Sequence, residues 1–195
     1  MTWAYYRRRT FPARACYHTF GPRFMASFVD SCVLWPVQLV AIVVLAQDIP
    51  QGLAVIVLVA QSLVWPLYTI SMHARFGQTV GKMVTRVRVL DARTEAPITP
   101  RQAVLRDGIP ALLTLGLAGY QAFLILTTAA SPRDVTSGEA LAASTAFWLL
   151  ALIPLVWFVA EVLTMLTNER RRALHDFIAG TVVIRTNVDD RLDRA

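Results

Sequence analysis

Apolar residues form four long runs along this chain, and polar links separate the runs. The runs cover residues 24–46, 52–74, 109–130 and 141–166. Each run exceeds the ~20 residues that a helix needs to cross the hydrocarbon core of a bilayer. The pattern therefore predicts an all-α membrane protein with four transmembrane helices.

The links between the runs predict how the helices are grouped. Residues 47–51 and 131–140 are short enough to join neighbouring helices as hairpins, whereas residues 75–108 form a long internal link. Inside this link, residues 85–90 alternate Val with Arg or Thr, which is typical of a strand, and residues 181–185 form a second strand candidate. A lone strand leaves its backbone groups unpaired, so we expect the two strands to pair. The predicted fold is two transmembrane hairpins with a short cytoplasmic β pairing.

Composition and charge support a membrane location and give an orientation. The 195 residues are 55% hydrophobic and only 16% charged, whereas soluble domains carry about 25% charged residues. Of the 19 Lys and Arg residues, 18 lie in the N-terminal arm, the long link and the tail after Leu166. The positive-inside rule therefore predicts that both termini are cytoplasmic. This asymmetry explains the net charge of +6 without nucleic-acid binding, and it favours anionic lipid headgroups as partners.

Two acidic residues inside the apolar runs are the main candidates for function. Asp30 lies seven residues after Arg23, on the same helical face and ~10 Å away along the axis. Glu161 lies ~9 Å from the cytoplasmic end of the fourth run, at a depth similar to that of Asp30. A membrane carboxylate costs at least ~2.5 kcal/mol, so Asp30 is protonated, pairs with a cation or faces a wet cavity. Arg23, Asp30 and Glu161 are therefore candidates for ion or proton binding; the alternative is that snorkelling arginines such as Arg23 or Arg106 neutralise both acids.

Other polar residues form no pattern typical of an enzyme. His18, His73 and His175 are scattered, and neither a metal-ligand pair nor a serine nucleophile motif occurs. We therefore expect neither an enzyme, nor a metal site, nor a cofactor. His175 and Asp176 follow Arg170–Arg172, and this group is expected to be a solvated ion cluster.

The long link also contains a glycine-rich segment with Gly77, Thr79, Gly81 and Lys82. It lacks the spacing of a nucleotide-binding loop, and it has no Ser or Thr after Lys82. Tight turning of the backbone at the membrane surface is the better explanation of its glycines.

Three ordered motifs make the chain resemble the RDD family of small bacterial membrane proteins, named for one arginine and two aspartates. The opening motif matches Arg23, Ala26 and Asp30. The glycine-rich segment and the closing Leu-His-Asp segment match the family motifs at Gly77, Thr79, Gly81, Lys82, Leu174, His175, Asp176, Ala179, Gly180 and Thr181. We take Asp176 as the second aspartate, with Asp107 as the alternative. The resemblance implies a bacterial cytoplasmic membrane protein and transport of small ligands, with sodium/proton antiport in some members.

The sequence thus predicts an N-terminal arm over residues 1–20, an RDD domain over residues 21–185 and a tail over residues 186–195. Two functions remain open. The first is a transporter or cation/proton exchanger that uses the buried carboxylates and works as a homo-oligomer, because four helices are few for alternating access. The second is a regulatory or assembly subunit that binds another membrane protein through its intramembrane charges.

Overall fold

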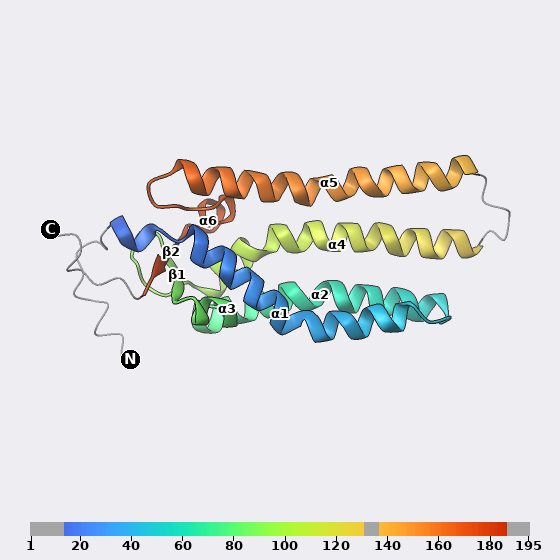
Figure 1. The fold of residues 1–195 in the computed structure, drawn as a ribbon, viewed down its shortest axis with the longest axis horizontal. Helices are drawn as coiled ribbons and strands as arrows, with labels where there is room; N and C mark the ends of the chain where they lie inside the picture. Colours follow the sequence, from blue (N-terminus) through green and yellow to red (C-terminus); the bar gives the residue numbers. More distant parts are fainter. Residues whose placement is uncertain (1–13, 131–136, 187–195) are drawn as a thin grey trace.

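The computed structural model describes residues 14–130 and 137–186. Four long helices run side by side, and shorter elements gather at one end of them (Figure 1). The elements in chain order are η2 (Arg14–Tyr17), α1 (Phe20–Leu45), α2 (Gln51–Phe76), α3 (Val80–Val84), β1 (Val87–Asp91), α4 (Pro100–Ala130), α5 (Ser137–Thr167), α6 (Leu174–Ala179) and β2 (Thr181–Arg185).

The four long helices confirm the predicted transmembrane helices. All four are long and apolar enough to cross a membrane, and 6–17% of each most apolar window is buried inside the protein. Their apolar side chains therefore face outward, as expected in a bilayer. Each long helix contains one proline in its interior, namely Pro36, Pro66, Pro110 and Pro154.

The helices begin and end at residues that suit these positions. α4 begins at Pro100, nine residues before the apolar run of the third span, and Thr99 and Gln102 form a capping box at this start. The backbone N–H of Gln102 donates to Thr99 Oγ1 at 3.2 Å, and that of Thr99 donates to Gln102 Oε1 at 2.9 Å. α2 ends at Gly77, whose φ of 66° is the left-handed conformation that favours glycine.

The helices pack across the two predicted hairpins as well as within them. α1 contacts α2, and α4 contacts α5, but the most extensive packing joins α2 to α4. α6 lies against both α4 and α5, and α3 lies against α1. Together, η2, α3, β1, α6 and β2 form what we call the cap, at one end of the four long helices (Figure 1).

The two predicted strands pair in the cap, which confirms that expectation. β1 and β2 are antiparallel, with Val89 opposite Val183. β1 begins at Val87 rather than at residue 85, because Arg86 adopts a left-handed φ of 56° between α3 and the strand. Both faces of this small sheet are covered by buried apolar side chains, namely Val87, Val89, Ile98, Ala103 and Val183 on one side and Tyr17, Leu90, Val182 and Ile184 on the other. The cap therefore has a hydrophobic core of its own.

Candidate functional site

Asp30 lies in α1 where α3 packs against it, and its carboxylate holds the start of α3. Oδ1 accepts hydrogen bonds from the Tyr68 hydroxyl at 2.6 Å and from the backbone N–H of Gly81 at 2.7 Å. Oδ2 accepts from the Thr79 hydroxyl at 2.6 Å. A carboxylate beside the first N–H groups of a helix is favourable because the helix dipole is positive there. Among the described residues no cation pairs with Asp30, so three neutral donors compensate its burial.

Gly81 explains why this segment of the long link is rich in glycine. A Cβ atom added at Gly81 would lie 2.0 Å from the carbonyl oxygen of Ala26 and 2.9 Å from Cγ of Asp30. No real Cβ comes so close to another atom, so only glycine allows α3 to reach α1. The expected tight turn lies at Gly77, with its φ of 66°, whereas Gly81 is required for the close approach of two helices.

Asp176 is the centre of a buried ion cluster. Its Oδ2 accepts from Arg23 Nη1 at 2.7 Å and from the backbone N–H of Ala173 at 3.0 Å. Its Oδ1 accepts from Arg106 Nη1 and, at 3.0 Å, from the Thr181 hydroxyl. We call Arg23, Arg106 and Asp176 the arginine–aspartate cluster; it joins α1, α4 and α6. The expectation that Asp176 belongs to a solvated ion cluster is wrong, because its side chain is fully buried.

The electrostatics of this cluster favour the ionised form of Asp176. Burial by itself would raise the pKa of this carboxyl group, but the guanidinium groups of Arg106 and Arg23 outweigh burial and hold the pKa well below its usual value. Arg172 holds the backbone on both sides of this carboxylate. It donates to the backbone oxygens of Thr181 and Asp176, both at 2.9 Å. The cluster is therefore a charged structural joint between three helices.

A hydrogen-bonded chain of ionisable groups joins α2, α3 and α4. Nδ1 of His73 lies 2.6 Å from Oδ2 of Asp107, and Nε2 of His73 lies 2.6 Å from Nζ of Lys82. The carboxylate of Asp107 selects the imidazole tautomer with its proton on Nδ1, so Nε2 accepts from the Lys82 ammonium group. We call Lys82, His73 and Asp107 the relay chain.

Lys82 is the one lysine in the sequence; every other basic residue that is not histidine is arginine. Burial, followed by repulsion from Arg106, lowers the pKa of Lys82 to about 7. Arginine keeps its proton at any physiological pH, whereas a buried lysine can release it. The single lysine thus stands at a position where its charge can change near neutral pH.

Glu161 of α5 pairs with His175 of α6. Its Oε1 accepts from the indole Nε1 of Trp157 at 2.8 Å and is hydrogen-bonded to Nδ1 of His175. Nε2 of His175 lies 3.7 Å from Oδ1 of Asp176, so this pair adjoins the arginine–aspartate cluster. Glu161 and Asp30 therefore have different partners, and neither depends on a direct contact with Arg23 or Arg106.

A cavity of about 430 Å³, which we call the inner cavity, brings these groups together between the long helices. Its ionisable lining residues are Asp30, His73, Lys82, Arg106, Asp107, Glu161 and His175. Trp65, Pro154 and Phe158 contribute apolar parts of the wall. Polar groups that converge in a largely apolar cavity are typical of a binding or transport site.

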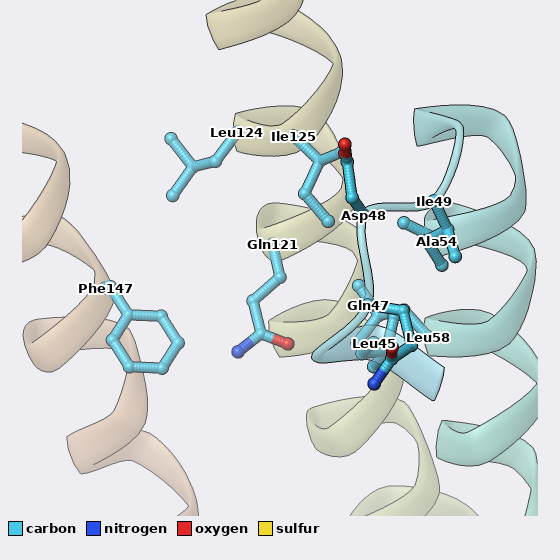
Figure 2. Close-up of a pocket in the computed structure, with 10 residues that line it drawn as sticks. All are labelled: Leu45, Gln47, Asp48, Ile49, Ala54, Leu58, Gln121, Leu124, Ile125 and Phe147. Carbon is cyan, nitrogen blue, oxygen red and sulfur yellow. The ribbon is translucent and has the colours of Figure 1, made fainter. Parts of the chain in front are cut away.

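A second cavity lies toward the end of the helices opposite the cap. This outer cavity of about 580 Å³ is lined by the α1–α2 link and by side chains of α2, α4 and α5. Figure 2 shows Gln121 pointing from α4 into the space between Phe147 of α5 and the link with Gln47 and Asp48. On α4, the outer cavity reaches Gln121 and the inner cavity reaches Thr114, two residues on one helical face ~10 Å apart. The two cavities thus follow the same side of α4.

The structure joins some of the predicted site residues and separates others. Asp30 and Glu161 both line the inner cavity, whereas Arg23 turns to Asp176. His73 and Asp107 were not predicted as site residues, and Lys82 was predicted only as a family motif residue. A signal was present in the sequence: His73 and Asp107 both lie near ends of apolar runs on the basic side of the chain.

The ligands of a metal site are not found in the described ranges, 14–130 and 137–186, where no group of three or more His, Cys, Asp or Glu residues could hold a metal ion. Cys16 and Cys32, both in the described ranges, are not joined in a disulfide. The inner cavity offers hydrogen-bonding and ionisable side chains.

Comparison with known proteins identifies the family. No curated protein and no solved structure matches the sequence. The RDD family matches it over residues 17–180, which include Arg23, Asp30, the glycine-rich segment and Asp176. This match covers most of the 195 residues. The chain, a multi-pass membrane protein by its four apolar helices, belongs to the RDD family.

Proposed function

We propose that this protein is a proton-coupled transporter, in which protons bind in the inner cavity in exchange for a cation or another small solute. The observation that carries the proposal is the relay chain, whose Lys82, His73 and Asp107 are joined by two hydrogen bonds of 2.6 Å. Ionisable residues inside a membrane protein are costly, and they commonly form proton pathways.

The relay chain can pass a proton in both directions. When the Lys82 ammonium group gives a proton to Nε2 of His73, the imidazole can give its Nδ1 proton to Asp107. The proton is then on the carboxyl group, Lys82 is neutral, and His73 has changed tautomer. Since the pKa of Lys82 lies near 7, Lys82 can release its proton at neutral pH, which an arginine at this position could not.

The two cavities support transport as well. The inner cavity and the outer cavity lie along the same face of α4, and Thr114 and Gln121, which line one cavity each, are ~10 Å apart along this helix. Alternating access requires a central site that is closed toward one side of the membrane. We propose that a movement of α5 relative to α4, whose mutual packing is less extensive than that of α2 with α4, joins the inner cavity to the outer cavity.

We further propose that the protein lies in the bacterial cytoplasmic membrane with its cap and both termini in the cytoplasm, because the basic residues are concentrated on that side. In this orientation, the relay chain lies near the cytoplasmic surface and the outer cavity near the opposite one. A homo-oligomer remains the expected assembly for the transport cycle.

The alternative function is that of a regulatory or assembly subunit for another membrane protein. The exposed arginines of the cap favour it, since Arg86, Arg93 and Arg170 are available to a partner. The intramembrane charges no longer favour it, because Asp30, Arg23 and Glu161 all find partners inside this chain. The proton-coupled transporter therefore has the stronger support.

The test is proton flux in liposomes that contain the purified protein and a pH-sensitive dye. Added Na⁺, K⁺ or Li⁺ should drive proton movement in the wild type, and the rate should change with an inflection near pH 7. Lys82→Gln should reduce the flux at least tenfold, and Lys82→Arg, which keeps the charge, should remove the inflection. Arg93→Gln, at an exposed position of the cap, serves as the matched control. A folded Lys82→Gln protein with wild-type flux would exclude the relay chain.

A further inference from the structure

A third cavity, the lateral cavity, lies between the first turns of α1 and the last turns of α5. Its volume is about 400 Å³, within the range of pockets that hold small molecules. One part of its wall is polar, with Arg23, Lys82, Arg106, Glu161 and His175. The other part is apolar, with Phe20, Phe24, Phe158, Val162 and Met165. The cavity is therefore amphipathic.

Arg23 and Arg106, at the polar end, have N–H donors without hydrogen-bond partners in the described part of the chain. Each gives its Nη1 to Asp176, whereas Nε and Nη2 of Arg23 and Nε of Arg106 have no hydrogen-bond partner in the described part of the chain. Oδ1 of Asp107 lies 4.0 Å from Nε of Arg106, which is beyond hydrogen-bond distance. A buried donor without a partner is destabilising. An anion with several oxygen atoms can satisfy such donors, and guanidinium groups suit phosphate in particular.

The lining of this end is richer in basic than in acidic side chains. Arg23, Arg106 and protonated Lys82 are positive, whereas Asp176 and Glu161 are negative. Glu161 would repel an anion, but its Oε1 already accepts from Trp157 and is hydrogen-bonded to His175. Asp107 lies 4.0 Å from Nε of Arg106 and adds a third carboxylate nearby, but it does not line the lateral cavity. The lining itself has three Arg or Lys side chains and one carboxylate, Glu161, which favours an anionic group there.

The apolar end fits a hydrocarbon chain. Phe24 and Phe158 are 60% and 53% exposed, so the cavity continues into the outer surface of α1 and α5. This surface belongs to helices that are apolar enough to cross a membrane. Basic pockets between transmembrane helices are known to bind anionic lipid headgroups.

We propose that the lateral cavity binds an anionic amphiphile, with a phosphate group beside Arg23, Arg106 and Lys82 and a hydrocarbon chain along Phe24 and Phe158. Phospholipid with an acidic headgroup has this chemistry. The proposal concerns binding, and it stands whether or not the relay chain transfers protons.

Native mass spectrometry of the delipidated full-length protein in detergent tests it. Phosphatidylglycerol should bind with one tight site, and phosphatidylcholine, whose headgroup is zwitterionic, should bind at least tenfold more weakly. Glycerol 3-phosphate, which has the phosphate group but no chain, should also bind at least tenfold more weakly. Equal binding of the two lipids would overturn the proposal. Tight binding of glycerol 3-phosphate would overturn it too, because the ligand would then be a water-soluble phosphate.

Two phenylalanines of α1 give a matched pair of variants. Phe24 lines the lateral cavity, whereas Phe28, which is 61% exposed, does not. Phe24→Ala should weaken phosphatidylglycerol binding about three- to tenfold through lost apolar contact, and Phe28→Ala should leave it unchanged. Lys82→Gln should weaken binding as well without breaking the arginine–aspartate cluster. Identical affinities in Phe24→Ala and Phe28→Ala would place the lipid elsewhere.

Discussion

At the scale of single residues, the hydrogen-bond donors around a buried carboxylate determine how the cost of its burial is compensated. Asp30 is 4% exposed, and it accepts from Tyr68, Thr79 and Gly81, none of which carries a charge. These hydrogen bonds compensate the burial of the carboxylate. The sequence alone allowed protonation, pairing with a cation or exposure to a wet cavity as the compensation. Asp30 also lines the inner cavity. Its hydrogen bonds from Thr79 and Gly81 hold α3 beside the relay chain.

The substitutions Asp30→Asn and Asp30→Ala should separate holding from proton binding. Asn keeps one acceptor oxygen, and Thr79 can turn its hydroxyl to accept from the amide. Asp30→Asn should therefore fold and retain most of the flux. Asp30→Ala should lose about 1–3 kcal/mol for each donor left unpaired, measured as the loss of folded protein on heating in detergent. Loss of flux in a stably folded Asp30→Asn protein would instead make Asp30 a proton or cation carrier.

Lys82 allows a direct measurement of its own titration. Because the chain has one lysine, ¹³C-methylation of amines should give a single lysine resonance that moves near pH 7 and is absent in Lys82→Arg. In the unfolded chain lysine stays protonated up to about pH 10.4. The unfolded state thus binds more protons above pH 7, and the free energy of unfolding should rise with pH from about 7 upward. A resonance that titrates near pH 10 would contradict both expectations.

At the scale of elements, α3 has only five residues and is stable because it is docked. Thr79 Oγ1 accepts from the backbone N–H of Lys82 at 3.4 Å, and Gly81 lies directly on the backbone of Ala26 in α1. So short a helix would not form alone in water. Its docking sets the position of Lys82, and hence of the relay chain.

Gly81→Ala should disturb the docking of α3, and it should destabilise the protein more than a glycine-to-alanine change elsewhere in a helix. Its Cβ would lie 2.0 Å from backbone oxygen, which requires movement of α3 at a cost of about 1–3 kcal/mol or more. Gly119→Ala in α4 is the control, because nothing lies within 4 Å of the added Cβ. Thermal unfolding in detergent should show a clear loss for Gly81→Ala and little change for Gly119→Ala. Equal melting temperatures would mean that α3 is not held in this way.

The elements that sequence could predict are those with a long or regular pattern. The four spans follow from uninterrupted apolar runs, and the strand pairing follows from two short alternating segments. α3 and α6 were not predicted, because five and six residues are too few to show a helical period. The Thr99–Gln102 capping box extended α4 beyond its apolar part.

At the scale of the whole molecule, Asp176 joins regions that lie far apart in the sequence. Its carboxylate binds Arg23 of α1 and Arg106 of α4. The sequence predicted Arg23 and Asp176 as motif residues but not as partners, because no periodicity relates residues 153 positions apart. For the same reason, it did not predict that His73, Lys82 and Asp107 would meet. Pairings of this kind depend on tertiary packing.

Asp176→Asn should destabilise the protein strongly. It leaves two buried guanidinium groups without their counter-charge, which costs roughly 3–5 kcal/mol. Since the folded-state pKa of Asp176 is lowered, its contribution is complete above the unfolded pKa of about 3.9 and declines as pH falls toward the folded value. The difference in unfolding free energy between wild type and variant should thus be constant from pH 5 to 8 and shrink below pH 4.

Glu169→Gln is the matched control for this change, because Glu169 is exposed in the turn before the cap. It should alter the free energy of unfolding by less than about 0.5 kcal/mol. If Asp176→Asn behaves like Glu169→Gln, the buried charge does not hold the three helices together.

The position of Asp176 in the chain also has a consequence for biosynthesis. The ribosome makes Arg23 and Arg106 long before it makes Asp176, which comes 153 and 70 residues after them. During membrane insertion we therefore expect both guanidinium groups to stay in contact with water or lipid headgroups. The helices cannot pack around them until Asp176 has been made. β2, which pairs with β1, is also made after all four long helices. Closure of the bundle is thus a late, post-insertion event, and nascent chains that stop before Asp176 should remain open to quality-control proteases.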